Sequence, residues 1–271
     1  MAEPMKAYFE EKGRISKSII SPCDKYECDG ACCRNKFQVE VTVFDLIDLG
    51  RATGHTPRDV FDKYCNIAPN AHDTDRMGDN VDEIEPVVSL KMPCALRNGG
   101  KCDVYSERPF VCMGFPEVFL LPESCTMPVN VSEYPCLMSQ KPFDIDAVRE
   151  ARRAYDIDRI SQSVFIQPFG ARVRRFANVM VDALPGSIQV FLSPLYPKED
   201  YDRFVCELWE HNKSSDPGSE TDVAALNAIF EERYGKVFRE KISDLSDDGG
   251  KSKLIGIRNH VLDFCDRSGL L

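Results

Sequence analysis

The sequence predicts an α+β protein, in which an irregular, cysteine-rich part with short strands is followed by a mainly helical part. Three observations lead to this fold class. Nine of the twelve cysteines are grouped into two clusters and a short tail between residues 23 and 136. Short apolar runs typical of strands lie in the same stretch. After Cys136 the pattern turns helical. The working division is therefore 1–140 and 141–271, as two domains or as one interlocked domain.

The N-terminal segments are predicted from their composition and period. Residues 1–20 predict a short helix or a loosely held arm. Residues 21–36 are rich in Cys, Asp and Gly and predict a metal-binding loop. Residues 37–41 alternate apolar and polar side chains, which is typical of a half-buried strand.

Two helix starts follow. Thr42 and Asp45 form a plausible N-cap pair, and the helix that they begin is expected to end at Gly50 or Gly54. Thr56-Pro57 begins a second helix, because proline suits the first helical position.

The next stretch is predicted to contain strands and turns. Residues 66–82 are polar and predict a loop, whereas residues 84–90 predict a strand that leads to the second cysteine cluster. Asn98-Gly99-Gly100 is a strong turn signal, expected to fold the chain back as a hairpin or knuckle. Residues 118–121 are a short strand candidate.

The C-terminal part shows helical periodicity, broken at Pro185-Gly186, Asp216-Pro217-Gly218 and 247–250. The predicted helices cover 144–165, 170–184, 198–213, 220–242 and 251–267.

Composition limits the class of protein. The 271 residues are 43% hydrophobic and 29% charged, which is ordinary for a soluble globular chain. The net charge of −10 argues against non-specific binding to nucleic acid. No window is apolar enough to span a membrane, and the N-terminus lacks the pattern of a signal peptide. A cytoplasmic protein is expected, where thiols stay reduced and a cysteine framework binds metal or does redox work.

The cysteine clusters therefore predict a metal site. The first cluster has the spacing Cys-x4-Cys-x3-Cys-Cys and the second Cys-x7-Cys-x9-Cys. Thiolates are soft ligands that suit zinc and iron–sulfur clusters, both of which usually take four cysteines. The candidate ligands are Cys23, Cys28, Cys32, Cys33, Cys94, Cys102, Cys112, Cys125 and Cys136. Cys65, Cys206 and Cys265 are instead expected to be buried apolar residues on helix faces.

Adjacent Cys32 and Cys33 bear on the kind of metal. In an extended chain, neighbouring side chains point in opposite directions. Two diverging thiols would serve two metals, or two irons of one cluster, which favours an iron–sulfur cluster over a single zinc. A zinc that only holds loops together is the alternative.

Two further side chains lie within the second cluster. Arg108 is held next to Pro109, close in sequence to the thiolates of Cys102 and Cys112, and Tyr105 precedes it. Arg108 could donate hydrogen bonds to metal-bound sulfur, bind a carboxylate or satisfy turn carbonyls. Tyr105 and Arg108 are thus candidates for support of the metal ligands.

These residues resemble the YkgJ-type cysteine-cluster family of zinc- or iron-chelating proteins, which is related to the flagellin lysine N-methylase FliB. The resemblance covers roughly residues 20–140 and rests on Cys32-Cys33, on Cys94 and on the run from Gly100 to Pro116. In that run, Lys101-Cys102, Tyr105, Arg108-Pro109 and Cys112 keep the order of the motif. Two features depart from it: the first cluster has wider spacing, and Met113 stands where an arginine is common. The resemblance implies metal chelation, and a catalytic role only for the methylase members.

Three functions are compatible with the sequence. The first is an intracellular protein with an iron–sulfur or zinc site, which acts in electron transfer, in metal handling or in support of a partner enzyme, and binds a protein partner. The second is an S-adenosylmethionine-dependent protein lysine N-methylase; no glycine-rich nucleotide loop and no Cys-x3-Cys-x2-Cys run supports it. The third is a non-catalytic interaction module with a structural zinc. No catalytic residue is assigned.

Overall fold

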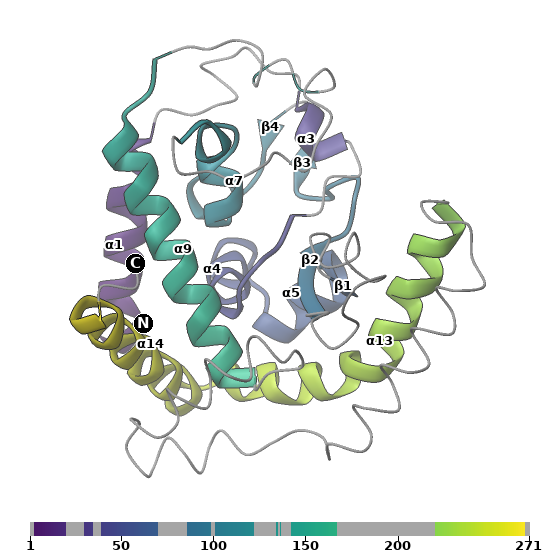
Figure 1. The fold of residues 1–271 in the computed structure, drawn as a ribbon. Helices are drawn as coiled ribbons and strands as arrows, with labels where there is room; N and C mark the ends of the chain where they lie inside the picture. The colour runs from purple at the N-terminus through teal and green to yellow at the C-terminus, as the bar shows by residue number, and fades with distance from the viewer. Residues whose placement is uncertain are drawn as a thin grey trace. The chain divides into compact units, whose positions relative to one another are not determined.

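The computed structural model describes residues 3–19, 30–34, 39–69, 86–98, 101–121, 134, 136, 142–166 and 220–268. These residues confirm the predicted class, because a few short strands are combined with many helices (Figure 1). The chain divides into two compact units: residues 1–65 with 90–158 and Leu271, and residues 66–89 with 159–270. The sequence-based boundary between residues 140 and 141 stays a prediction.

The elements follow one another along the chain in a fixed order. The helices are α1 (Glu3–Ser18), α3 (Ala31–Arg34), α4 (Val43–Thr53), α5 (Pro57–Tyr64), α7 (Phe110–Gly114), α9 (Ile145–Ile166), α13 (Glu220–Ser243) and α14 (Asp248–Ser268). The 3-10 helices are η2 (Tyr105–Glu107), η3 (Glu117–Leu120) and η5 (Asp244–Ser246). The strands are β1 (Cys65–Pro69), β2 (Pro86–Leu90), β3 (Arg97–Asn98) and β4 (Lys101–Cys102).

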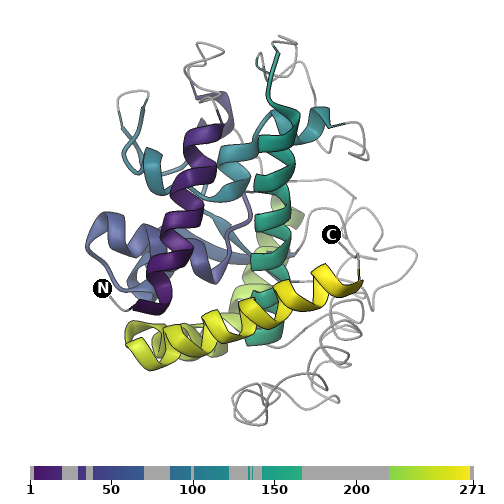
Figure 2. The ribbon, with the colours of Figure 1, turned by 90° about the vertical axis from the view of Figure 1, so that its left-hand side faces the viewer.

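Helix α1 is packed into the first unit rather than held loosely. Met5, Tyr8 and Ile15 are buried, at the spacing that places side chains on one face of a helix. The Tyr8 hydroxyl donates to the Asp158 carboxylate of α9 at 2.8 Å. Figures 1 and 2 show α1 and α9 running side by side.

The two predicted helix starts are confirmed. Thr42 and Asp45 form a complete capping box for α4, and Thr56 forms another with Asp59 for α5, where Pro57 is the first helical residue. Helix α4 continues through Gly50 and ends at Gly54, which adopts φ 72°. A positive φ is accessible to glycine without steric cost, so Gly54 is the effective stop.

The strand predictions are confirmed in part. The hairpin turn at residues 98–100 is confirmed by the antiparallel pairing of β3 with β4, and the strand at 84–90 by β2. Residue Glu40 forms only an isolated bridge, although Val39 and Val41 are buried on either side of it.

Two local predictions are wrong. The start of the predicted 66–82 loop is strand β1, whose Ile67 and Ala68 are buried beside β2. The predicted strand at 118–121 is the 3-10 helix η3, because Pro116 takes helical backbone angles (φ −90°, ψ −8°) and leads the chain into a tight turn.

The second unit contains α13, η5 and α14. Its core is apolar, and Phe230, Ile242, Leu254 and Val261 are fully buried. These helices confirm the predictions at 220–242 and 251–267. Helix α14 begins at Asp248, directly before the glycines at 249 and 250, because the Asp247 carboxylate accepts the Gly250 N–H at 2.7 Å.

Several predictions fall on residues outside the described ranges. These are the helices at 170–184 and 198–213 and the breaks at 185–186 and 216–218. Among the helices that are described, none is both long and apolar enough to cross a membrane.

Candidate metal centre

Short elements of the first unit carry the described cysteines of the two clusters. Cys32 and Cys33 lie on α3, Cys94 precedes β3, Cys102 ends β4 and Cys112 lies on α7. All five are free thiols that are partly accessible to solvent. Figure 1 shows α3 beside the β3–β4 hairpin, with α7 in the same region of the first unit.

Backbone hydrogen bonds join the first cluster to the second. The N–H of Cys94 donates to the carbonyl of Cys33 at 2.8 Å, and the N–H of Arg97 donates to the carbonyl of Cys94 at 3.2 Å. Arg97 in turn pairs with Cys102 across the hairpin. Residues that are about sixty positions apart in sequence are thus fastened together by main-chain contacts.

Four thiols form one electrostatic group. Burial is the main cause that raises the pKa of Cys94, Cys102 and Cys112, and the neighbouring thiols raise it further. The charge of Cys33 raises the pKa of Cys94, Cys102 and Cys112, and Cys102 raises the pKa of Cys94 and Cys112.

Backbone donors partly offset this effect. Leu96 hydrogen-bonds the sulfur of Cys94 and Val104 that of Cys102, and both bonds lower the pKa of the thiol. Each donor lies two residues after its cysteine. Such bonds hold a sulfur in place and favour its ionised, ligating form.

Cys33 differs from the other three thiols. Its pKa is lowered to about 7, first by a hydrogen bond with Cys32 and then by the positive charges of Arg97 and Arg34. The sulfurs of Cys32 and Cys33 lie 4.0 Å apart. The extended geometry expected for this pair is wrong, because residues 31–34 are helical. Two thiolates on one tetrahedral zinc lie about 3.8 Å apart, so the two sulfurs need not serve separate metals.

Arg108 lies near two of the thiols, and Tyr105 packs against Arg108; their supporting role stays a prediction. The guanidinium carbon of Arg108 lies 4.0 Å from the centre of the Tyr105 ring. Arg108 is 4% exposed, and its charge acts to lower the pKa of Cys102 and Cys112. Its Nε has no hydrogen-bond partner within the described residues.

Of the remaining predicted ligands, the structure describes only Cys136. Cys136 is buried, and Tyr134, two residues earlier, packs edge-on against Phe115 at the end of α7, with 5.6 Å between ring centres. Cys23, Cys28 and Cys125 lie outside the described residues. Of the cysteines expected to be structural, Cys65 and Cys265 are buried, although Cys65 lies in a strand rather than on a helix.

Gly30 and Arg97 were not identified from the sequence. Gly30 adopts φ 82°, and its carbonyl accepts the N–H groups of Cys33 and Arg34 at the start of α3. The Arg97 side chain covers it so closely that a Cβ on Gly30 would lie 2.5 Å from Arg97 Nε. A glycine two residues before the Cys32-Cys33 pair, and an arginine between two predicted ligands, were the available signals.

The thiols do not yet have the spacing of metal ligands. Within the described ranges, no three Cys, His, Asp or Glu side chains are close enough to hold one ion. Binding of a metal would therefore have to draw the four thiols together and displace their protons.

Comparisons with known proteins identify the same region. A search of curated proteins and a search of solved structures found no match to this chain. A family model does match, and it covers every candidate ligand from Cys23 to Cys136. Residues 22–137 of the chain are therefore shown to match the CxxCxxCC family, described as "putative zinc- or iron-chelating domain", which confirms the resemblance seen in the sequence.

Proposed function

We propose that this protein is an intracellular metalloprotein that binds an iron–sulfur cluster at one thiolate site. The observation that carries the proposal is that main-chain contacts bring the two cysteine clusters together: Cys94 N–H donates to the Cys33 carbonyl at 2.8 Å, and Arg97 pairs with Cys102 across the hairpin. Cys33, Cys94 and Cys102 thus lie in one region, near Cys112 of α7. These four thiols are the proposed core ligands. Cys23, Cys28, Cys125 and Cys136 are further candidates, and Cys32 is a fifth thiol beside the core.

The donor atoms of the site are those that an iron–sulfur cluster requires. Thiolates are the usual ligands of iron–sulfur clusters, and hydrogen bonds to their sulfurs set the properties of the cluster. Leu96 and Val104 supply two such bonds to the free thiols. The unpartnered Nε of buried Arg108 is a further donor next to Cys102 and Cys112. When bound, an iron–sulfur cluster would supply one-electron chemistry.

The number of thiols fits either a single zinc or an iron–sulfur cluster, since each usually takes four cysteines. The described residues gather five thiols in this region, one more than either group needs. The feature that favours the cluster is the set of backbone hydrogen bonds to the sulfurs of Cys94 and Cys102.

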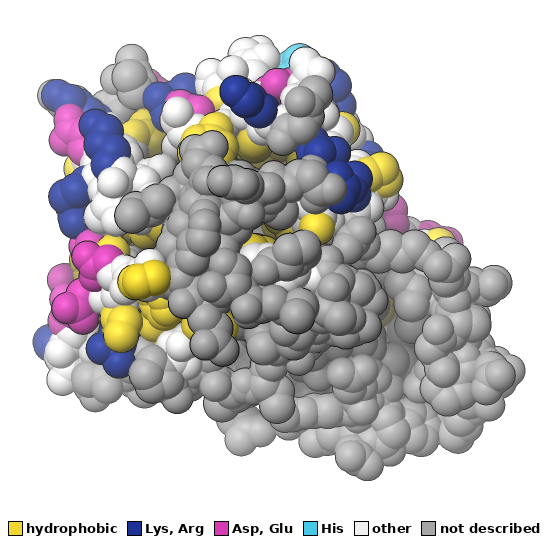
Figure 3. All heavy atoms as spheres, turned by 90° about the horizontal axis from the view of Figure 1, so that it is seen from above, with side chains coloured by type: hydrophobic (Ala, Val, Ile, Leu, Met, Phe, Trp, Pro, Cys, Tyr) yellow, Lys and Arg dark blue, Asp and Glu magenta, His cyan; other side chains and the backbone are white. Residues whose placement is uncertain are grey.

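The charge of the chain supports a protein partner over nucleic acid. The net charge is −10, and basic and acidic side chains are interspersed on the described part of the face shown in Figure 3. Non-specific nucleic-acid binding needs a surplus of basic groups. A role in electron transfer, in metal handling or in support of a partner enzyme follows from this proposal.

The first experiment measures iron, zinc and acid-labile sulfide per chain after anaerobic purification, with a visible spectrum. We expect iron with matching sulfide and a thiolate-to-iron absorption band. Zinc without sulfide would overturn the iron–sulfur proposal and leave a zinc-stapled module. A folded protein that contains no metal after reconstitution with both metals would overturn the site itself.

A pair of variants tests the ligand assignment. Cys112→Ala removes a proposed ligand, whereas Cys265→Ala removes a buried thiol of the second unit. We expect the first variant to lose most of its bound metal and the second to keep the wild-type content. Equal metal contents in the two variants would exclude Cys112 as a ligand.

A further inference from the structure

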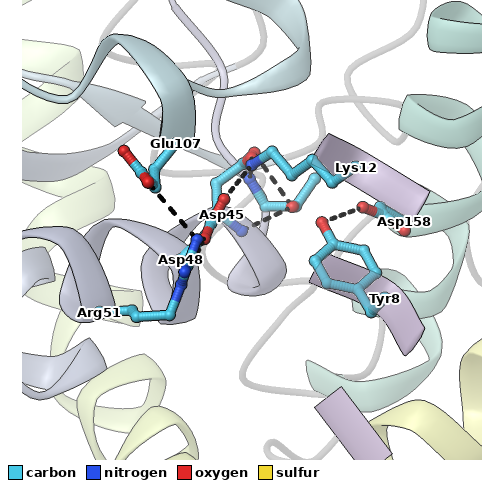
Figure 4. A network of polar contacts seen from close by, with 8 residues as sticks. Tyr8, Lys12, Asp45, Asp48, Arg51, Glu107 and Asp158 are labelled. Atoms are coloured by element: carbon cyan, nitrogen blue, oxygen red, sulfur yellow. Dashed lines mark hydrogen bonds and ion pairs between the residues drawn. The ribbon is translucent and has the colours of Figure 1, made fainter. Parts of the chain in front are cut away.

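Helix α1 carries a buried lysine whose ammonium is surrounded by partners. Lys12 is 2% exposed, and its Nζ lies 2.9 Å from Asp45 Oδ1 and 3.1 Å from Asp48 Oδ2 (Figure 4). The Phe110 ring of α7 lies 5.2 Å from the same nitrogen, within the range of a cation–π contact. Burial by itself lowers the pKa of Lys12, but the two carboxylates outweigh it and raise the pKa above its usual value. Lys12 is therefore charged at neutral pH.

The network continues from Lys12 to the edge of the metal centre. The second oxygen of Asp48 binds the Arg51 guanidinium at 2.8 Å, and Arg51 forms an ion pair of 3.6 Å with Glu107 (Figure 4). The second oxygen of Asp45 accepts the N–H of Thr42 at 2.9 Å. Each carboxylate oxygen of the two buried aspartates is thus occupied.

This network holds one particular segment. Glu107 ends η2 and Phe110 begins α7, so the charges of α1 and α4 contact the chain on both sides of Arg108. The same segment leads to Cys112. Buried ion networks are costly to desolvate and contribute little net stability, but removal of one partner disrupts them strongly. Their best-attested use is to impose one arrangement on the groups that they join.

We propose that Lys12 is a positioning residue of the metal centre, which fixes residues 105–112 so that Arg108 and Cys112 face the other thiols. This inference rests on the proposed function, because it assigns Lys12 a role in the same site. Lys12 does not contact a candidate ligand directly. It acts through Phe110 and, by way of Asp48 and Arg51, through Glu107.

The test uses Lys12→Met, which keeps the length of the side chain and removes its charge. We expect amide hydrogen exchange in residues 105–115 of the metal-free protein to accelerate by about tenfold or more, since a broken buried ion network lowers the free energy of local opening. Exchange in residues 254–265 of α14 serves as the internal control and should stay at the wild-type rate.

A matched variant separates positioning from general weakening of α1. Tyr8→Phe removes a different buried polar bond of the same helix, which joins it to Asp158 of α9. We expect this variant to leave exchange in residues 105–115 unchanged. The proposal is wrong if the two variants accelerate that segment equally, or if Lys12→Met accelerates α14 as much as residues 105–115.

The rate at which bound metal is released is a second readout, and a change in general stability does not alter it. Transfer of bound metal to excess chelator should be about tenfold faster or more in Lys12→Met and unchanged in Tyr8→Phe, because support of a metal ligand ordinarily contributes that much to affinity. If Lys12→Met does not fold, Phe110→Leu removes the ring beside the ammonium and keeps an apolar side chain in this buried position. Its metal release should still exceed that of Tyr8→Phe, and equal rates would overturn the proposal. A wild-type protein that binds no metal would refute the proposed function, while the exchange of residues 105–115 would still test Lys12.

Discussion

At the scale of single residues, the candidate metal centre contains a glycine whose conformation is special. Gly30 has φ 82°, a conformation that is costly for other residues, and the Arg97 side chain occupies the space of a Cβ. The guanidinium of Arg97 can therefore lie over the start of α3 and act on Cys33. This pairing links the two cysteine clusters through a side chain, in addition to the main-chain bond between Cys94 and Cys33.

We predict that Gly30→Ala lowers the free energy of unfolding by about 1–3 kcal/mol, because it combines backbone strain with the displacement of Arg97. Gly13→Ala is the matched control: Gly13 lies within α1 and a Cβ there would meet no atom within 4 Å. The control should stabilise the protein by about 0.5–1 kcal/mol, as expected for alanine in a helix. Urea denaturation of both variants measures the difference. Equal changes of unfolding free energy in the two variants would show that the Arg97 side chain does not need the space beside Gly30.

At the scale of elements, the two capping boxes have the same chemistry and different surroundings. Thr42 is 2% exposed, and its partner Asp45 also binds Lys12. Thr56 and its partner Asp59 are exposed. The Thr42 box is therefore part of the buried ion network, whereas the Thr56 box caps only its own helix.

We predict that Thr42→Ala destabilises the protein by about 2 kcal/mol and Thr56→Ala by about 1 kcal/mol, at the upper end and the middle of the range for such caps. The larger cost at Thr42 arises because its loss also leaves the Asp45 carboxylate without one of its buried partners. Thermal or urea denaturation distinguishes the two. Equal losses of unfolding free energy in the two variants would mean that the contact of Asp45 with Lys12 adds nothing to the strength of the cap.

The elements also show what the sequence can predict. Local signals were sufficient for the helix starts at Thr42 and Thr56 and for the turn after Asn98, because each depends on neighbouring residues only. Strand β1 was missed, since it is short and adjoins a polar stretch, and its strand conformation depends on pairing with β2 across sixteen intervening residues. The candidate ligands were recognised from residue type and spacing, and their assignment stays a prediction. Their grouping was not recognised, because it depends on the helical turn of α3 and on Arg97.

At the scale of the whole molecule, the two units have separate apolar cores. In the first, Phe44, Leu49 and Phe61 are fully buried; in the second, Phe230 and Leu254 are fully buried. All described thiols of the candidate centre belong to the first unit. We therefore expect the second unit to stay folded without support from the metal.

This division leads to a prediction about metal removal. Where a site is assembled from loops and short helices, the free energy of metal binding is largely the free energy of ordering those segments. Comparison of metal-loaded and metal-free protein by hydrogen exchange should show that residues 31–34 and 94–112 lose protection by about 100-fold or more on metal removal. Residues 248–268 should keep theirs, because Leu254, Ile257, Val261 and Cys265 are buried in the core of their own unit. If α14 loses protection to the same extent, the metal orders the whole chain and the two units do not fold independently. If only the ligand segments respond, the centre is a local assembly whose occupancy can change while the helical part stays folded.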